Sequence, residues 1–318
     1  MGKRIMAQGS FPFISEIQAK VGQESSFQAS EPVDAGKVRR FAKALGFENP
    51  LYYDLEKGQP VAPLTFVFSV GHDSLADWDS LGRPTYAFSP PSTHGLVLRA
   101  GNDYRFSRPA QVGDLICTRR RVKEVKEKVG HSGPLLFLTY DLEYTTQNGE
   151  PLGINTETII FQTNRPGLKK QEPSGVKPFL VPGEGEEIPP LQVQISKLQM
   201  MRYAAATGDA YLLHWDPDFS RRHGLPNVNA AGYMFGDYLT EMLVRWTKNP
   251  GSVKSLNYAN RAMAFPGDTL VCRGKIRTDS EKAGKRHAVC RVWVENQKRQ
   301  MLVEGMATVV PPPASSRA

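Results

Sequence analysis

Cysteine is scarce in this chain of 318 residues, which contains Cys117, Cys272 and Cys290 and no others. The three do not form a C-x-x-C pair, and an odd, sparse set argues against both a disulfide framework and a zinc site. Cysteines used this way are typical of a reducing compartment. We therefore expect a cytoplasmic protein without a structural metal.

Long apolar runs are missing as well. No segment approaches the roughly 20 apolar residues that a helix needs to span a bilayer. Residues 1–10 carry two basic side chains but have no apolar core behind them, which argues against a secretory signal. The sequence predicts no membrane span.

Signatures of nucleic-acid binding are also absent. The net charge of +8 is moderate, and the densest basic run, residues 119–128, is diluted by Glu124 and Glu127. Such a run is typical of the solvated end of a strand pair, although it could attract a nucleotide-bearing ligand. Without a zinc-finger or RNA-recognition motif, we expect no nucleic-acid partner.

What the chain does contain is an internal repeat. The apolar content of 40% and charged content of 23% indicate a globular protein, and the length suits about two domains. In each half a helical pattern ends at a glycine, and Gly46 is as far from Asp54 as Gly208 is from Asp216. The segment QVGDLIC is echoed by FPGDTLVC, and a strand pair follows each. This self-similarity predicts two copies of one unit.

The boundaries follow from composition. Residues 164–190 are rich in proline, glycine and charge, which is typical of a linker. We therefore expect one copy in residues 1–163 and a second in residues 191–318. Residues 1 to about 30 are expected to form a loose lead-in, and residues 72–100 an irregular segment.

Each copy reads as a helix, an apolar segment and then hairpin-linked strands. This order predicts an α+β architecture, with helices on one face of an antiparallel sheet. Residues 230–246 are apolar around most of a helix circumference, so a sheet should wrap this helix. The matching segment of the first copy, residues 62–70, reads as a short helix or a strand.

Two side chains in the second copy suit acid–base chemistry. Asp209 directly follows the helix-ending Gly208, and four residues separate it from His214. Asp216 and Pro217 are typical of the start of another helix, so the pair lies on a loop held between helix ends. A carboxylate and an imidazole can share one water molecule there. This arrangement suits the addition of water to a double bond or its removal.

The spacing alone is weak evidence, because Asp209 could cap a turn and His214 could be an ordinary loop histidine. A metal site is not indicated, since His223 is too isolated to complete one. A nucleophilic triad is not indicated either, because no Ser or Cys occupies a nucleophile elbow.

The surrounding residues carry a resemblance. Thr207-Gly208-Asp209-x4-His214-Trp-Asp216-Pro-x-Phe, followed by Gly232 and by Phe-Pro-Gly-Asp-Thr at 265–269, resembles the MaoC-like (R)-specific enoyl-CoA hydratase and dehydratase family. The resemblance is strongest over residues 196–310 and weaker over residues 33–162. It implies a double hot-dog fold, in which two antiparallel sheets each wrap a central helix and form a pseudo-dimer within one chain.

The resemblance also implies roles for particular residues. Asp209 and His214 match the family's catalytic dyad, and Gly232 matches the residue whose backbone N–H holds the thioester oxygen. A helix N-terminus is independently a good place to stabilise an oxyanion. Thr240 lies where the family often has a serine near the dyad, although its hydroxyl could equally bond to its own helix.

The sequence departs from the family pattern at three positions. Tyr211 and Leu212 stand where the family usually has Asn-Pro, and Ala231 stands where it usually has His. In the first copy, Phe47 and Tyr52 occupy the places of the dyad. That copy is therefore expected to be catalytically blank, and to complete the sheet and wall the acyl and CoA channel.

The favoured interpretation is reversible hydration of trans-2-enoyl thioesters to (3R)-3-hydroxyacyl thioesters. The alternatives are a hot-dog thioesterase with Asp209 as base, or a non-catalytic acyl-thioester binding protein. We expect no separate cofactor, because CoA or acyl carrier protein is part of the substrate, and a homodimer of the chain is possible. Four basic residues could meet the CoA phosphates or simply be solvated: Arg221, Arg222, Arg261 and Lys275.

Overall fold

The computed structural model describes residue 11 and residues 13–53, 60–70, 78–83, 96–130, 133–162, 185–282 and 285–312. Most of the expected linker, up to residue 184, lies outside these residues, as does Asp54. The last four residues of the expected linker, 187–190, belong to a strand.

The first half contains three α-helices, one 3₁₀ helix and five strands in its described residues. In chain order they are α1 (Ile14–Gln18), β1 (Glu24–Gln28), α2 (Ala35–Leu45), η1 (Pro50–Tyr52), α3 (Phe66–Val70), β2 (Leu96–Phe106), β3 (Ile116–Gly130), β4 (Gly133–Thr146) and β5 (Pro151–Gln162).

The second half follows the same plan with a longer central helix. Its elements are β6 (Glu187–Gln194), α4 (Lys197–Thr207), η2 (Leu212–His214), α5 (Pro217–Arg222), α6 (Gly232–Thr247), η3 (Pro250–Ser252), β7 (Val253–Asn260), β8 (Thr269–Lys282), β9 (Lys285–Asn296) and β10 (Met301–Val309).

The strands join into one antiparallel sheet of ten, in the order β1-β3-β4-β5-β2-β7-β10-β9-β8-β6. The second five repeat the first five in reverse, because β7 corresponds to β2 and β6 to β1. The two expected sheets are therefore continuous, and the pairing of β2 with β7 is the seam between the copies. Gly101 pairs with Ala259 there, and Asn102 pairs with Tyr258.

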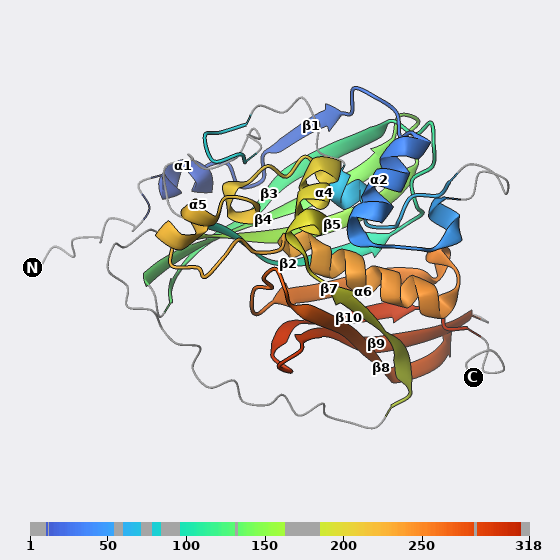
Figure 1. Ribbon diagram of the computed structural model, residues 1–318. Coiled ribbons are helices and arrows are strands. Elements are labelled where there is room, and N and C mark those ends of the chain that lie inside the picture. Colours follow the sequence, from blue (N-terminus) through green and yellow to red (C-terminus); the bar gives the residue numbers. More distant parts are fainter. Residues whose placement is uncertain are drawn as a thin grey trace, which may run out of the picture.

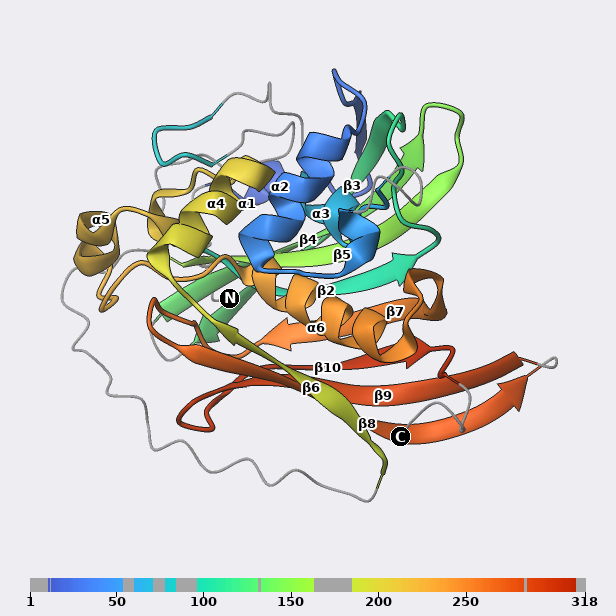
Figure 2. The ribbon, with the colours of Figure 1, turned by 45° about the vertical axis from the view of Figure 1, so that its right-hand side comes forward.

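Helices cover one face of this sheet. In Figures 1 and 2, α6 lies between the α2–α4 layer and the strands β8 to β10. All but two residues of α6 are buried, as expected for a helix that is apolar nearly all round. In the first copy, the segment that could have been helix or strand forms the short helix α3.

Local signals explain the paired helices α2 and α4. The side chain of Asp34 accepts a hydrogen bond from Lys37 N, and Ser196 accepts one from Gln199 N. Both helices end at a glycine in the left-handed region, Gly46 at φ 72° and Gly208 at φ 73°. The helix ends predicted at these two glycines are thus confirmed in both copies.

Two expectations were wrong. The lead-in is not loose throughout, because residues 14–18 form α1 and residues 24–28 form β1, which pairs with β3. The irregular segment ends early, because β2 begins at Leu96. Long-range strand pairing, which local pattern does not encode, accounts for β1 and β2.

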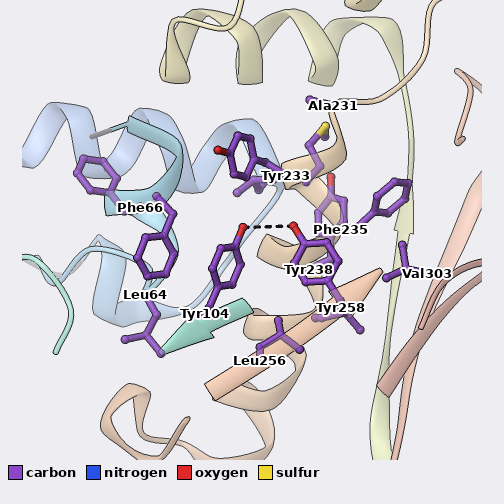
Figure 3. Close-up of a cluster of buried hydrophobic side chains, with 14 of the residues drawn as sticks. Leu64, Phe66, Tyr104, Ala231, Tyr233, Phe235, Tyr238, Leu256, Tyr258 and Val303 are labelled. Atoms are coloured by element: carbon purple, nitrogen blue, oxygen red, sulfur yellow. Dashed lines mark hydrogen bonds between the residues drawn. The ribbon is translucent and has the colours of Figure 1, made fainter. Parts of the chain in front are cut away.

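The core runs across the seam. Figure 3 shows Tyr104 of β2 hydrogen-bonded to Tyr258 of β7, with the two hydroxyl oxygens 3.2 Å apart. The hydroxyl of Tyr258 also donates to Asn102 Oδ1 at 3.0 Å. The two copies therefore share one interior at the place where α6 begins.

Candidate active site

The site begins where α4 stops. Gly208 turns the chain, so Asp209 projects from a loop rather than from a helix face. The Asp209 Oδ1 atom accepts a hydrogen bond from Tyr211 N at 3.4 Å. The single turn of η2 then places His214 back beside Asp209. We call residues 208–216 the dyad loop.

The two reactive groups face each other. His214 Nε2 lies 3.5 Å from Asp209 Oδ2, and the side chains are 12% and 28% exposed respectively. His214 Nδ1 lies 2.8 Å from the carbonyl oxygen of Asn229. Because a carbonyl only accepts, Nδ1 carries the proton, and neutral His214 then presents an Nε2 lone pair toward Asp209. This separation is too short for a water molecule between the two atoms, but one water beside the pair can hydrogen-bond to both.

Gly232 begins α6 on the other side of the site. Its N-cap, Ala231, makes no side-chain hydrogen bond to the first turn, so the helix N-terminus is not closed by a capping side chain. A Cβ atom at Gly232 would lie 2.9 Å from Arg99 Cβ and 3.0 Å from Asn260 Nδ2. The missing side chain thus allows β2 and β7 to come close to the start of α6.

One cavity of about 560 Å³, which we call the dyad cavity, brings these groups together. Asp209, His214 and Gly232 all line it, and so does Asn229, which orients the histidine. Residues of the first copy form the opposite wall, among them Val97, Ile159 and Phe161. A second cavity of about 310 Å³ lies on the first-copy side and shares Arg99, Glu157, Asp209 and Tyr233 with it.

The remaining predicted positions lie elsewhere. Thr240 is buried in α6 and does not line the dyad cavity. Among the described residues, its Oγ1 has no hydrogen-bond partner. Phe47 and Tyr52, at the dyad positions of the first copy, are core residues whose rings lie 6.2 Å apart. The Tyr52 hydroxyl donates to Glu241 of α6 at 2.6 Å. These first-copy positions hold the copies together.

The four basic candidates differ in their surroundings. Arg261 lines the dyad cavity and pairs with Glu304 at 2.7 Å. Arg221 pairs with Asp218, and Lys275 pairs with Glu187 at 3.2 Å. Arg222 lies at the end of α5 and does not line either described cavity.

Several contacts around the site were not predicted. Tyr211 sends its hydroxyl to the first copy, where it accepts a hydrogen bond from Val97 N at 3.2 Å. Leu212 N donates to Leu81 O at 2.9 Å, and a Cβ atom on Gly82 would lie 2.0 Å from Ala210 O. Arg99 had a visible signal, since it is a charge within the apolar run Leu-Val-Leu-Arg at 96–99. The other contacts join positions more than a hundred residues apart and leave no local pattern.

The described part of the chain contains no group of His, Cys, Asp or Glu side chains placed to hold a metal ion. Nor does any helix within it have the length and apolar character that crossing a membrane requires.

Comparison with known proteins matches both halves. Residues 19–154 match the model of the FAS1-like dehydratase domain region, and residues 183–297 match that of the MaoC-like domain. A mesaconyl-C(4)-CoA hydratase from Chloroflexus aurantiacus is 25% identical over 213 residues, covering 65% of this chain and 67% of that protein.

Solved structures share the fold. A MaoC-like dehydratase superposes with a TM-score of 0.72 at 20% identity, covering 92% of this chain and 99% of the other. A conserved hypothetical protein from Mycobacterium tuberculosis, described as a double hotdog fold, gives 0.61 at 15% identity over 91% and 96% of the two chains. The predicted double hot-dog fold is confirmed.

Proposed function

We propose that this chain, which belongs to the MaoC-like dehydratases and carries two copies of the hot-dog unit, reversibly hydrates trans-2-enoyl thioesters to (3R)-3-hydroxyacyl thioesters. The observation that carries the proposal is the convergence of Asp209, His214 and Gly232 on one cavity. The hydratase name of the Chloroflexus relative supports the reaction class, and its CoA substrate supports CoA as the carrier.

The geometry supports distinct acid–base roles for His214 and Asp209. With Nδ1–H donated to Asn229 O, His214 Nε2 accepts a proton from a water that Asp209 Oδ2 also holds. The water oxygen attacks C3 of the enoyl group, and the dyad returns a proton to C2. General acid–base help of this kind contributes roughly 10²- to 10⁴-fold to a rate.

Gly232 supplies the electrostatic stabilisation of the developing oxyanion. In this proposal the backbone N–H of Gly232, at the start of α6, donates to the thioester oxygen, where negative charge develops as C3 is attacked. Removing one such donor from an enzyme typically costs about 10²- to 10³-fold in kcat. In the reverse direction the same groups remove water from the hydroxyacyl thioester.

The test uses Asp209→Asn and His214→Ala, assayed with crotonyl-CoA and longer trans-2-enoyl-CoAs. Each change should lower kcat at least roughly 100-fold. His223→Ala is the matched control, because this histidine bonds to Phe219 O in the same segment and does not line the dyad cavity. Near-wild-type turnover by either variant would contradict the assignment of Asp209 and His214 as the catalytic dyad.

Product analysis separates the alternatives. A coupled assay with a (3S)-specific hydroxyacyl dehydrogenase should detect no product, because the proposed alcohol is (3R). Release of free CoA from a saturated acyl-CoA would instead indicate the thioesterase, and tight acyl-CoA binding without turnover would indicate the binding protein.

A further inference from the structure

A cluster of buried charges lies beside the proposed thioester site and has no part in the hydration steps. Glu157 of β5 is 3% exposed, and its carboxylate pairs with Arg99 of β2 at 2.7 Å and with Arg120 of β3 at 3.5 Å. The hydroxyl of Tyr233, the residue after Gly232, also donates to Glu157. We call Arg99, Arg120, Glu157 and Tyr233 the arginine cluster.

The arginine cluster forms part of the cavity wall. All four residues line the 560 Å³ cavity, and three of them also line the adjoining 310 Å³ cavity. Within the cluster, two guanidinium groups share the Glu157 carboxylate. Other ion pairs at the larger cavity join Asp79 to Arg83 and Arg261 to Glu304, each at 2.7 Å, and Glu304 also lies 3.6 Å from Arg291.

Arg99 is positioned closest to the reaction centre. Its Cβ and Cδ atoms lie 2.9 and 3.4 Å from the place of a Cβ atom on Gly232. Its guanidinium carbon lies 3.4 Å above the ring of Tyr233, which fixes the side chain in place. A bound acyl group whose thioester oxygen is at Gly232 would therefore have this guanidinium within reach of its chain.

An alkyl chain does not suit this wall. Covering buried ions with hydrocarbon removes their remaining solvation without giving any hydrogen bond in return. A carboxylate suits it, because a planar guanidinium can donate two parallel hydrogen bonds to it. The phosphates of CoA are not candidates for this place, since the pantetheine arm separates them from the thioester.

We infer that the acyl group of the substrate carries a free carboxylate, and that Arg99 is the residue that binds it. This inference rests on the proposed hydration at the same site and narrows its substrate class to carboxylated enoyl thioesters. Recognition of this kind rejects an analogue that lacks the polar group, because N–H donors of the guanidinium are then covered without gaining an acceptor.

The test compares matched thioesters that differ at the end of the acyl chain. Turnover is measured with hex-2-enoyl-CoA and 5-carboxypent-2-enoyl-CoA, and with the shorter pair crotonyl-CoA and 3-carboxyacryloyl-CoA. Affinity is measured by calorimetry with the saturated, unreactive pair hexanoyl-CoA and adipoyl-CoA. The wild type should favour the carboxylated member in kcat/KM and in affinity by roughly 10- to 150-fold, the range expected for a hydrogen bond to a charged group.

Arg99→Gln should abolish this preference by weakening the carboxylated member more than the neutral one. The double variant Arg99→Gln, Glu157→Gln removes a positive and a negative charge together and guards against loss of folding. Arg273→Gln is the control, since this arginine pairs with Glu295 at 2.8 Å and lines neither cavity.

Equal affinities for the saturated pair, or an equal loss on both members in Arg99→Gln, would overturn the inference. Because binding of the saturated pair needs no chemistry, it decides the inference even if no enoyl thioester is turned over. Failure of every enoyl thioester to react would count against the proposed hydration alone.

Discussion

At the scale of single residues, backbone from the first copy holds the dyad loop in place. Leu81 O accepts from Leu212 N, and the Tyr211 hydroxyl accepts from Val97 N. Gly82, at φ 73°, lies so close to Ala210 O that no side chain fits between them. Ala210 O also accepts from Trp215 Nε1 at 2.8 Å, so the carbonyl next to Asp209 is fixed on two sides.

This contact predicts a specific effect of Gly82→Ala. The added Cβ would lie 2.0 Å from Ala210 O, so the dyad loop must shift. Displacement of a catalytic group by about 1 Å can cost roughly 100-fold in rate, and we expect kcat to fall by that order. The assay is the enoyl-CoA turnover described above, together with a thermal melt.

Gly149→Ala is the matched control for this variant. Gly149 has nearly the same backbone angle, φ 78°, but lies in the β4–β5 turn with nothing within 4 Å of an added Cβ. Both changes carry the left-handed penalty of about 1–2 kcal/mol, so both should lower Tm. Equal loss of kcat in the two variants would show that Gly82 has no positioning role.

Single residues also show which parts of the candidate site could be predicted from the sequence. Asp209 and His214 could be singled out because they lie in a dense local motif, and the structure brings them to 3.5 Å. Tyr211 was visible as a departure from the family pattern, but its partner Val97 was not. Arg99 and Glu157 lie on strands of the first copy, and their proximity to Gly232 depends on the register across the seam.

At the scale of elements, α6 is an apolar helix with two buried acids. Glu241 is bound by Tyr52 and by Arg245, whose Nε lies 2.9 Å from Glu241 Oε1. Asp237 is 1% exposed, and its Oδ2 accepts from the Tyr203 hydroxyl at 2.8 Å. Burial raises the pKa of Asp237 to about 7, although hydrogen bonds from Thr65, Tyr203 and Ser69 oppose the shift.

The shift makes stability depend on pH with a definite sign. In the unfolded chain the pKa of an aspartate is about 3.9, so from there to about pH 7 the folded state keeps a proton that the unfolded state has lost. The stability that Asp237 contributes is therefore present at low pH and is lost as the pH rises through this window.

Asp237→Asn removes this titration. The free energy of unfolding of the variant minus that of the wild type should rise between about pH 4 and pH 7 and then level off, with a total change of a few kcal/mol. Urea unfolding of both proteins across this range measures the difference. A difference that does not change with pH would mean that Asp237 is ionised in the folded state at all these values.

Elements themselves were predictable to different degrees. Helices α2 and α4 were marked by Asp34, Ser196 and their terminal glycines, which are local signals. Strand β2 was not, because residues 72–100 were expected to be irregular and Gly101, Asn102 and Asp103 are residues that strands disfavour. It becomes a strand because β5 and β7 pair with its two edges and Asn102 Nδ2 bonds Asn155 Oδ1 at 2.9 Å. Tertiary context here overrides local propensity.

At the scale of the whole molecule, the two copies share more than a linker. The seam between β2 and β7 makes one sheet of ten strands, and hydroxyls cross between the copies above it. The hydroxyl oxygens of Tyr203 in α4 and Ser69 in α3 lie 3.2 Å apart, and Tyr52 donates to Glu241. The repeat was readable from the sequence, but the fusion of the two sheets was not, since the seam residues carry no repeat signal.

These shared contacts predict that the copies unfold together. Three of the four tryptophans, Trp215, Trp246 and Trp293, lie in the second copy, so tryptophan fluorescence mainly follows that half, whereas far-ultraviolet circular dichroism follows both. Chains of this size often unfold in steps, but a continuous sheet couples the halves, and we expect the two melting curves to coincide. A first transition seen by circular dichroism alone would show that the copies are independent.

Tyr258→Phe tests the seam directly. Its hydroxyl is buried and bridges Asn102 Oδ1 at 3.0 Å and the Tyr104 hydroxyl at 3.2 Å, both in the first copy. Losing it leaves buried polar groups without that partner, which should lower the free energy of unfolding by about 1–3 kcal/mol. Tyr53→Phe removes a hydroxyl that donates to Phe47 O at 2.6 Å within the first copy and serves as the control.

Because the seam is one of several links between the copies, the unfolding transition of Tyr258→Phe should shift to lower denaturant concentration and remain single. A split transition would show that this one hydroxyl couples the copies. An unchanged midpoint would show that it does not stabilise the seam.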